Sequence, residues 1–352
     1  MQTNVKLAPF RSQFINIQGG LVMKRIAKVL AVVMVALMAV SLAGCAAKPK
    51  DDAKKALKVG ILLPGAINDK GWNASAYEGL QKAKEKFGVD VSYMENVAPS
   101  DMEEVFRRYA SQGYDLVLGH GYQFSDAAAK VAKEFPKVKF GILNGNVTAE
   151  PNLASYQFTN WQPGYVTGVL AGLITKKNSI GAIGGQKIPV IEDALNAFKD
   201  GVLSVNPKAK VVITYVDTWD DVAKGKETAL AMIRNGADVT VCDANAVGLG
   251  NIQAAKEKGT YAIGFVDDQY SVAPETVVAS GIQSNQTMVA FAVEQLVKGQ
   301  FAAKSYTLGI KEGAEGLSPL YDWENKLPKD VIAKVKQIQQ DIIDGKITWT
   351  KH

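Results

Sequence analysis

Short apolar runs alternate with segments of helical periodicity in the first half of the chain. In residues 72–87, for example, Ala76, Leu80 and Ala83 recur at a spacing that places apolar side chains on one face of a helix. The predicted elements of this half are strands at 59–63, 89–93, 115–118 and 139–143 and helices at 72–87, 101–112 and 126–134. Such alternation predicts a parallel sheet with helices on both faces.

The alternation then restarts in the second half of the chain. The predicted elements there are helices at 164–175, 192–205, 221–235 and 249–258 and strands at 179–183, 210–215, 238–242 and 261–265. No Pro/Gly-rich linker separates the two halves. We therefore expect an α/β protein with two lobes that are joined by short crossings.

Polar and aromatic residues follow the predicted strands in both halves. Because ligands of open α/β sheets bind beyond the carboxyl ends of the strands, these residues are the candidate ligand contacts. The candidates are Asp69, Trp72, Asn73, His120, Gly121, Tyr122, Asn144, Trp219, Asn245 and Asp268.

The N-terminal segment has the pattern of a secretory signal. Basic residues (Lys24, Arg25 and Lys28) precede an apolar run at 29–40, and small residues lead to Cys45. The run is shorter than the ~20 residues that a membrane-spanning helix needs. We therefore expect a signal peptide at 1–45, a flexible small and charged tether at 46–57, and a folded part that begins near residue 58.

Net charge and cysteine content exclude several classes of function. The chain carries a formal charge of +5, but residues 1–45 hold five basic residues and no acidic one. The remainder has 35 basic and 35 acidic side chains, so its net charge is zero. It lacks the excess of positive charge that binding to the phosphates of a nucleic acid requires. The two cysteines and two histidines form no cluster with zinc spacing, so neither a metal nor a cofactor is expected.

Two resemblances sharpen these expectations. The sequence Leu-Ala-Gly-Cys at 42–45 resembles a bacterial lipobox, which implies cleavage before Cys45 and lipidation of its thiol. The segments at 67–73, 119–122, 215–220 and 264–269 together resemble the basic membrane protein family of extracytoplasmic solute-binding lipoproteins, which includes bacterial purine nucleoside receptors.

The family resemblance implies a type I periplasmic-binding-protein fold, with two lobes and a three-crossing hinge. It places residues 58–158 and 283–308 in lobe 1 and residues 159–282 and 309–352 in lobe 2. It implies a monomer, lipid-anchored outside the cytoplasmic membrane, that closes on a purine nucleoside or base and delivers it to an ABC permease. The aromatic rings that stack on the ligand map to Trp72 in the first lobe and Trp219 in the second.

The sequence departs from the family pattern at two positions. Val266 stands where the receptors have the aspartate that holds ribose hydroxyls, and Leu63-Pro64 occupies the place of an acidic residue after the first strand. A free purine base, or a ligand that holds its polar part differently, is therefore an alternative to a nucleoside. A flavin is another flat ligand that two tryptophans could grip.

Several candidate residues also have a plain structural interpretation. Asp69 can cap the helix at 72–87, Asp268 can belong to a turn, and His120 can be a satisfied loop histidine. A nucleoside-hydrolysing enzyme that uses Asp69 and Asp268 is the alternative from another class of function. The chain has no Gly-x-Ser-x-Gly elbow, phosphate-binding loop or metal-ligand cluster, so we expect a binding protein without catalysis.

Overall fold

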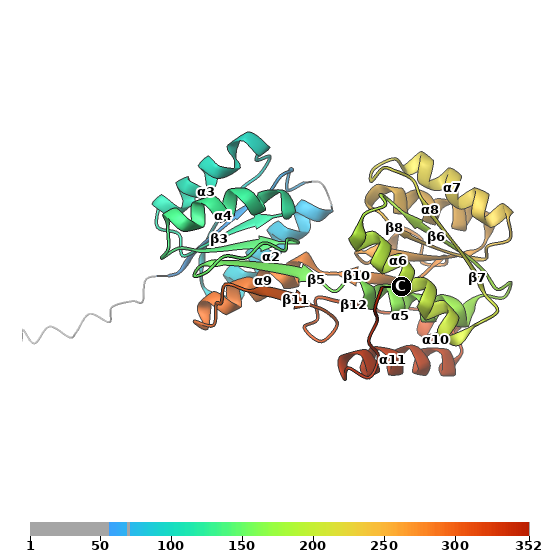
Figure 1. The fold of residues 1–352 in the computed structure, drawn as a ribbon. Coiled ribbons are helices and arrows are strands. Elements are labelled where there is room, and N and C mark those ends of the chain that lie inside the picture. Colours follow the sequence, from blue (N-terminus) through green and yellow to red (C-terminus); the bar gives the residue numbers. More distant parts are fainter. Residues whose placement is uncertain (1–55, 69–70, 352) are drawn as a thin grey trace, which may run out of the picture. The chain divides into compact units, whose positions relative to one another are not determined.

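The computed structural model describes residues 56–68 and 71–351, which form two six-stranded sheets with helices on their faces (Figure 1). The predicted signal peptide, the lipobox with Cys45 and most of the predicted tether lie outside the described residues. The α/β class that the alternating pattern predicts is confirmed.

The first sheet has the strand order β2-β1-β3-β4-β5-β11, and all of its strands are parallel. Its strands are β1 (Lys58–Leu62), β2 (Asp90–Met94), β3 (Leu116–His120), β4 (Lys139–Leu143), β5 (Leu153–Phe158) and β11 (Ser305–Leu308). Its helices are α2 (Trp72–Phe87), α3 (Met102–Ser111), α4 (Ser125–Glu134) and α9 (Asn285–Val297). The last helix and strand of this unit thus come from much later in the chain.

The second sheet repeats this order as β7-β6-β8-β9-β10-β12, with β12 antiparallel to β10. Its strands are β6 (Ser179–Gly184), β7 (Lys210–Tyr215), β8 (Val239–Asp243), β9 (Tyr261–Val266), β10 (Val277–Gln283) and β12 (Glu315–Leu317). Its helices are α5 (Trp161–Ile174), α6 (Pro189–Val205), α7 (Val222–Arg234), α8 (Asn245–Lys258), α10 (Trp323–Lys326) and α11 (Lys329–Ile343).

Alternation of apolar side chains along the strands explains why each sheet is covered on both faces. On β1, Val59 and Ile61 pack in the cluster beneath α2 and α9, whereas Leu62 points into the cluster beneath α3 and α4. Figure 1 shows these two helix pairs on opposite faces of the first sheet. In the second sheet, the largest cluster joins α5, α6 and α11, and a smaller one lies beneath α7 and α8.

Three connections cross between the sheets: from β5 to α5, from β10 to α9, and from β11 to β12. Backbone hydrogen bonds join them in pairs. The amide of Thr159 donates to the carbonyl of Leu308 at 3.2 Å, and the amide of Ser284 donates to the carbonyl of Ala314 at 2.7 Å. The connections therefore form one hydrogen-bonded junction.

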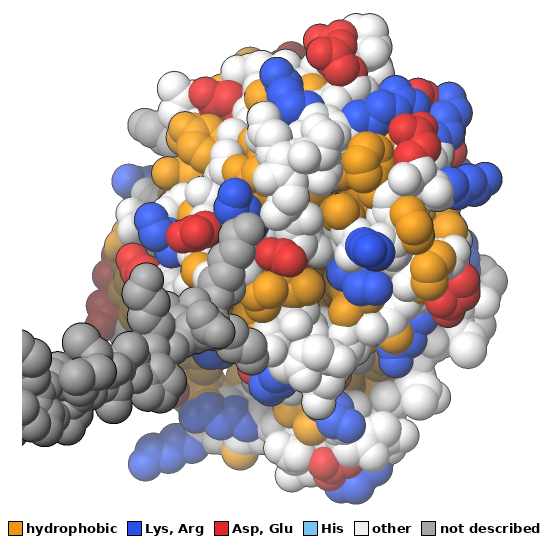
Figure 2. Space-filling model, turned by 90° about the vertical axis from the view of Figure 1, so that its left-hand side faces the viewer, with side chains coloured by type: hydrophobic (Ala, Val, Ile, Leu, Met, Phe, Trp, Pro, Cys, Tyr) orange, Lys and Arg blue, Asp and Glu red, His pale blue; other side chains and the backbone are white. Residues whose placement is uncertain are grey.

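Charge is mixed on the surface. On the face that Figure 2 presents, lysine and arginine side chains are interspersed with aspartate, glutamate and hydrophobic side chains, rather than gathered in one stripe. In the part of the chain that the structure describes, none of the helices combines the length and the hydrophobicity that a bilayer crossing requires.

Candidate functional site

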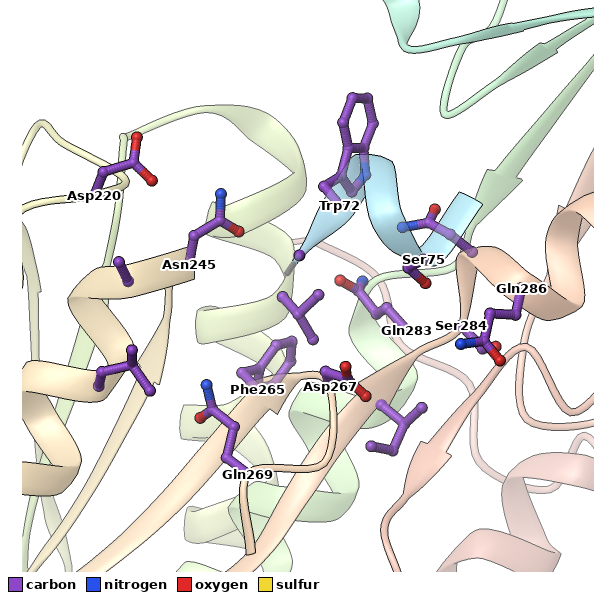
Figure 3. Close-up of a pocket in the computed structure, with 16 residues that line it drawn as sticks. Trp72, Ser75, Asp220, Asn245, Phe265, Asp267, Gln269, Gln283, Ser284 and Gln286 are labelled. Atoms are coloured by element: carbon purple, nitrogen blue, oxygen red, sulfur yellow. The ribbon is translucent and has the colours of Figure 1, made fainter. Parts of the chain in front are cut away.

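A pocket of about 460 Å³ lies where strand ends of the second sheet meet the first turns of three helices (Figure 3). This volume is within the range that small-molecule sites occupy. Its walls come from the ends of β9 and β10, from the starts of α2, α8 and α9, and from Asp220 before α7. The pocket thus lies beyond the carboxyl ends of parallel strands, where ligands of such sheets bind.

The end of β9 has an unusual backbone. Val266 lines the pocket and has a φ of 73°, a left-handed value that β-branched residues rarely adopt. Asp267, which follows it, also lines the pocket. Backbone strain of this kind concentrates at functional sites, so the conformation of Val266 supports a role for this edge of the sheet.

The aromatic residues of the pocket lining are Phe265 and Trp72. The Trp72 indole stacks on the fully buried imidazole of His120, with ring centroids 3.7 Å apart and an interplanar angle of 29°. The backbone at Gly121 approaches the same indole so closely that a Cβ there would lie 2.9 Å from it, and the φ of Gly121 is 116°. The β3–α4 loop therefore fixes the indole at the start of α2.

The remaining lining is rich in side-chain amides. The amide residues are Asn245, Gln269, Gln283, Asn285 and Gln286, and the carboxylates are Asp220 and Asp267. Each amide offers both a donor and an acceptor, which suits a ligand with mixed hydrogen-bonding edges. The Oε1 atom of Gln269 is buried without a hydrogen-bond partner in the described part of the chain. Because an unsatisfied buried acceptor is costly, a ligand donor would stabilise it.

Among the predicted contacts, Trp72 and Asn245 line the pocket directly. Asn144 reaches it through one neighbour, because its Nδ2 donates to the Oδ1 of the pocket residue Asn285 at 3.0 Å. Asn73 ties the start of α2 to the preceding loop, since its Oδ1 accepts from the amide of Gly65 at 3.3 Å. Trp72 and Asn245 thus line the pocket, Asn144 lies next to it, and Asn73 holds the start of α2.

Other described candidates that do not line the pocket are His120, Gly121, Tyr122 and Trp219. The Trp219 ring packs over Gly185, where a Cβ would lie 2.4 Å from it, whereas its neighbour Asp220 lines the pocket. Tyr122 is 75% exposed. Asp69 lies outside the described residues. The part of these residues in ligand binding stays a prediction.

The carboxylate of Asp268 is engaged within the second unit. It accepts from the hydroxyl of Tyr321 at 2.6 Å and from the amide of Tyr270 at 3.0 Å. The adjacent Asp267 lines the pocket instead.

Gln283, Asn285 and Gln286 line the pocket but were not among the polar residues predicted from the sequence to lie there. All three lie at the end of β10 or in the first turn of α9, and β10 was not predicted. Ser284 could have signalled this segment, because its hydroxyl accepts from the amide of Thr287 at 3.1 Å as a helix N-cap. Gln269 closes the 264–269 segment, which pointed to this strand end.

One buried carboxyl near the pocket titrates unusually. Asp243 ends β8, is 2% exposed, and burial raises the pKa of its carboxyl to about 7. Because the pKa of this carboxyl is higher in the folded than in the unfolded chain, its protonated form favours folding. This contribution to the free energy of unfolding is complete at low pH and is lost as the pH rises through about 7.

We therefore expect Asp243→Asn to reduce the loss of stability between pH 5 and pH 8. A pKa shift of one unit corresponds to about 1.4 kcal/mol, so the effect is on the order of a few kcal/mol. Urea unfolding across this pH range measures it, with Asp90→Asn at an exposed position as the control. A wild-type pH dependence in Asp243→Asn would contradict the assignment.

Comparison with known proteins identifies the family of the chain. The model for PnrA-like ABC transporter substrate-binding proteins, Bmp, matches residues 56–351. The chain belongs to this family. The nucleoside-binding protein BmpA of an ABC transporter from Lactococcus lactis is 33% identical over 352 residues, with 91% of this chain and 98% of that protein covered.

Two further comparisons agree with Bmp membership. A purine-binding protein of Brucella abortus is 29% identical over 301 residues, with 84% of this chain and 85% of that protein covered. A solved ABC transporter solute-binding protein from Aeropyrum pernix matches with a TM-score of 0.72 at 25% identity, with 84% of this chain and 94% of that chain covered.

Membership of the Bmp family confirms the predicted family and the periplasmic-binding-protein fold. The chain is thus an ABC-transporter solute-binding protein, of the class that binds a small ligand and a permease outside the cytoplasm. The family consists of solute-binding proteins rather than enzymes.

Proposed function

We propose that this protein binds a purine nucleoside or a purine base in the pocket beside Trp72 and delivers it to an ABC permease. The proposal draws on two relatives, the nucleoside-binding protein of Lactococcus lactis and the purine-binding protein of Brucella abortus. The observation that carries it is an indole, stacked on His120, at the edge of a pocket that five side-chain amides also line.

A purine matches this combination of surfaces. Its flat face can stack on the Trp72 indole, and stacking of a base on an aromatic side chain contributes about 1–3 kcal/mol. Its ring nitrogens and exocyclic groups can pair with Asn245 and with the buried acceptor of Gln269. Stacking supplies affinity for any flat ring, and the amides supply selection among them.

Closure of the two lobes on the ligand is the expected mechanism of capture. Hinge bending around a ligand is common in two-lobed binding proteins. Pocket closure excludes water, and hydrogen bonds become stronger in the resulting medium of lower dielectric constant. The ligand-free chain is therefore expected to favour the open arrangement.

The proposed location is outside the cytoplasm, in the periplasm or at the cell surface, with Cys45 as the lipid anchor to a membrane. The support is the Leu-Ala-Gly-Cys sequence after a basic and apolar segment. Multiple acyl chains on one residue would hold the chain stably at the membrane. Mass spectrometry of the membrane-extracted protein tests this, because an unmodified Cys45 within an intact N-terminal segment would contradict it.

Ligand identity is tested with the purified full chain by titration calorimetry against adenosine, guanosine, inosine, adenine and riboflavin. We expect saturable heat with at least one purine compound and none with ribose or glucose. Binding of sugars alone, or of riboflavin alone, would contradict the proposed ligand class.

The same mixtures are analysed by chromatography for released base. Turnover of a nucleoside would support the alternative of a nucleoside-hydrolysing enzyme, for which Asp69 and Asp268 were the predicted carboxylates and for which Asp220 and Asp267 line the pocket. Unchanged nucleoside in the presence of heat of binding supports the binding protein.

A further inference from the structure

One buried carboxyl touches all three connections between the sheets. Glu315 is the first residue of β12, at the end of the third connection, and is 4% exposed. On the first connection, the hydroxyl of Thr159 donates to its Oε2 and the amide of Asn160 donates to its Oε1 at 2.9 Å. On the second, the Nε2 of Gln283 lies 3.4 Å from the same Oε1. The donors meet at one carboxylate.

Gln283 belongs to this cluster and to the pocket at once. Its Nε2 also donates to the Oδ1 of Asn160 at 3.0 Å, and the residue lines the pocket, where Figure 3 shows it between Ser75 and Phe265. Because both hydrogen-bond acceptors are oxygen atoms, the amide group of Gln283 is oriented with its nitrogen toward them and its Oε1 on the other side. Among the described residues, its Oε1 receives no hydrogen bond.

The protonation state of Glu315 matters for this arrangement. A carboxylate only accepts, so it matches three donors, whereas a protonated carboxyl carries a hydroxyl on one oxygen. Burial raises the pKa of Glu315 to about 7, and the hydrogen bonds from Thr159, Asn160 and Gln283 oppose that rise.

Few titratable groups face Glu315. The elements packed against β12 are β10, which has no titratable side chain, and α5, whose sequence contains only Tyr165. On its own connection, Lys311 and Glu312 are exposed.

We propose that Glu315 is a positioning residue: it holds the nitrogen of the Gln283 amide in the hinge, so that the pocket presents the Gln283 carbonyl oxygen to an N–H or O–H donor of the ligand. This inference rests on the proposed function and adds a specific acceptor to it. It accounts for the burial of an acidic side chain at the junction of the three connections.

The test compares four variants of the full chain with wild type: Glu315→Gln, Gln283→Met, the double variant, and Glu312→Gln. Glu312 is the matched control, because its carboxylate accepts from the amide of Gly309 on the same connection at 2.9 Å and it is exposed. The dissociation constant of the purine compound that binds wild type is measured by calorimetry from pH 5.5 to pH 8.5.

We expect Glu315→Gln to weaken binding about three- to tenfold at pH 8, as the loss of one oriented hydrogen bond predicts. We expect wild-type binding to weaken as the pH falls below about 7, because Glu315 then becomes protonated, and we expect this dependence to be absent in Glu315→Gln and in Gln283→Met. Glu312→Gln keeps the wild-type profile. Because Glu315 acts through Gln283, the double variant binds no more weakly than Gln283→Met.

Equal affinity of Glu315→Gln and wild type at every pH would overturn the proposal, as would additive effects in the double variant. Should Glu315→Gln not fold, the pH profile of Gln283→Met decides, and a wild-type profile there overturns the proposal. If no purine binds wild type, the proposed function has failed. Hydrogen exchange of the peptide at 158–162 then decides: faster exchange in Glu315→Gln than in Glu312→Gln supports the contact with Asn160, and equal exchange overturns it.

Discussion

Substitution of Gly168 by valine is expected to lower the free energy of unfolding by about 3 kcal/mol, the upper part of the range for overpacking. A Cβ at Gly168 would lie 2.0 Å from the carbonyl oxygen of Phe198 on α6. The obstacle is backbone in a helix, so it cannot move aside as the end of a flexible side chain could. A loss of this size is a large fraction of the stability of an ordinary domain.

The expected effect is large because Gly168 belongs to a row of glycines at which helices α5 and α6 approach closely. Gly164, Gly168 and Gly172 follow one another at four-residue intervals on α5, and a Cβ at Gly164 would lie 2.1 Å from the carbonyl oxygen of Ala194. On α6, a Cβ at Gly201 would lie 2.2 Å from the carbonyl oxygen of Tyr165. The two helices therefore pack backbone to backbone across the face of the second sheet.

Urea unfolding followed by far-UV circular dichroism measures this effect. The matched control is Gly248→Ala within α8, where the nearest atom to an added Cβ is 3.6 Å away. That change is expected to leave stability unchanged or to raise it by up to about 1 kcal/mol, because alanine favours helices more than glycine. A wild-type unfolding midpoint for Gly168→Val would show that α5 and α6 separate at little cost.

Periodicity predicted the elements whose apolar residues keep a regular spacing. Helix α2 has the predicted bounds, and Gly88 in the left-handed conformation ends it. Helix α8 begins at Asn245, four residues before the prediction, because Gly248 and Gly250 interrupt the apolar pattern. Gly250 is there for packing, since a Cβ would lie 2.1 Å from the carbonyl oxygen of Val222.

Strands β5, β10, β11 and β12 were not predicted from the sequence. Strand β5 contains Ser155 and Gln157, and β10 contains Ser280 and Gly281, so neither resembles a continuous apolar run. Their place in the sheets is set by neighbouring strands rather than by local preference. Because β10 was not predicted, Gln283 at its end was not recognised as a candidate. Gln283 lines the pocket and also contacts Asn160 and Glu315 in the connections between the sheets.

The sequence located the edges of the sheets where the pocket lies, but not which side chain faces it. Asp267 and Asp268 are adjacent and chemically alike, and the difference between them arises from Tyr321, a partner 53 residues away. Likewise, the stacking of Trp72 on His120 joins the start of α2 to the end of β3, 48 residues apart in the chain. Contacts between residues so far apart in the chain leave no local pattern in the sequence, so the local sequence does not determine which side chain faces the pocket.

Substitution of Trp72 by alanine is expected to weaken purine binding by about 1–3 kcal/mol, which is the contribution of one base stacked on one aromatic ring. The indole is already ordered by His120 and Gly121, so the ligand does not have to immobilise it on binding. Trp72→Phe keeps a smaller aromatic face and should lose less. Calorimetric titration of the purine compound that binds wild type measures both changes.

The control is Trp349→Ala, which removes a tryptophan outside the pocket lining whose Nε1 donates to Asp200 at 2.8 Å. This variant should bind as wild type does. Thermal unfolding of both variants separates a lost ligand contact from a damaged fold, because Trp72 is the first residue of its helix and its removal leaves the α2–α9 cluster in place. Wild-type affinity in a folded Trp72→Ala would mean that the indole only covers His120, and the ligand would then have to bind through the amides of the pocket alone.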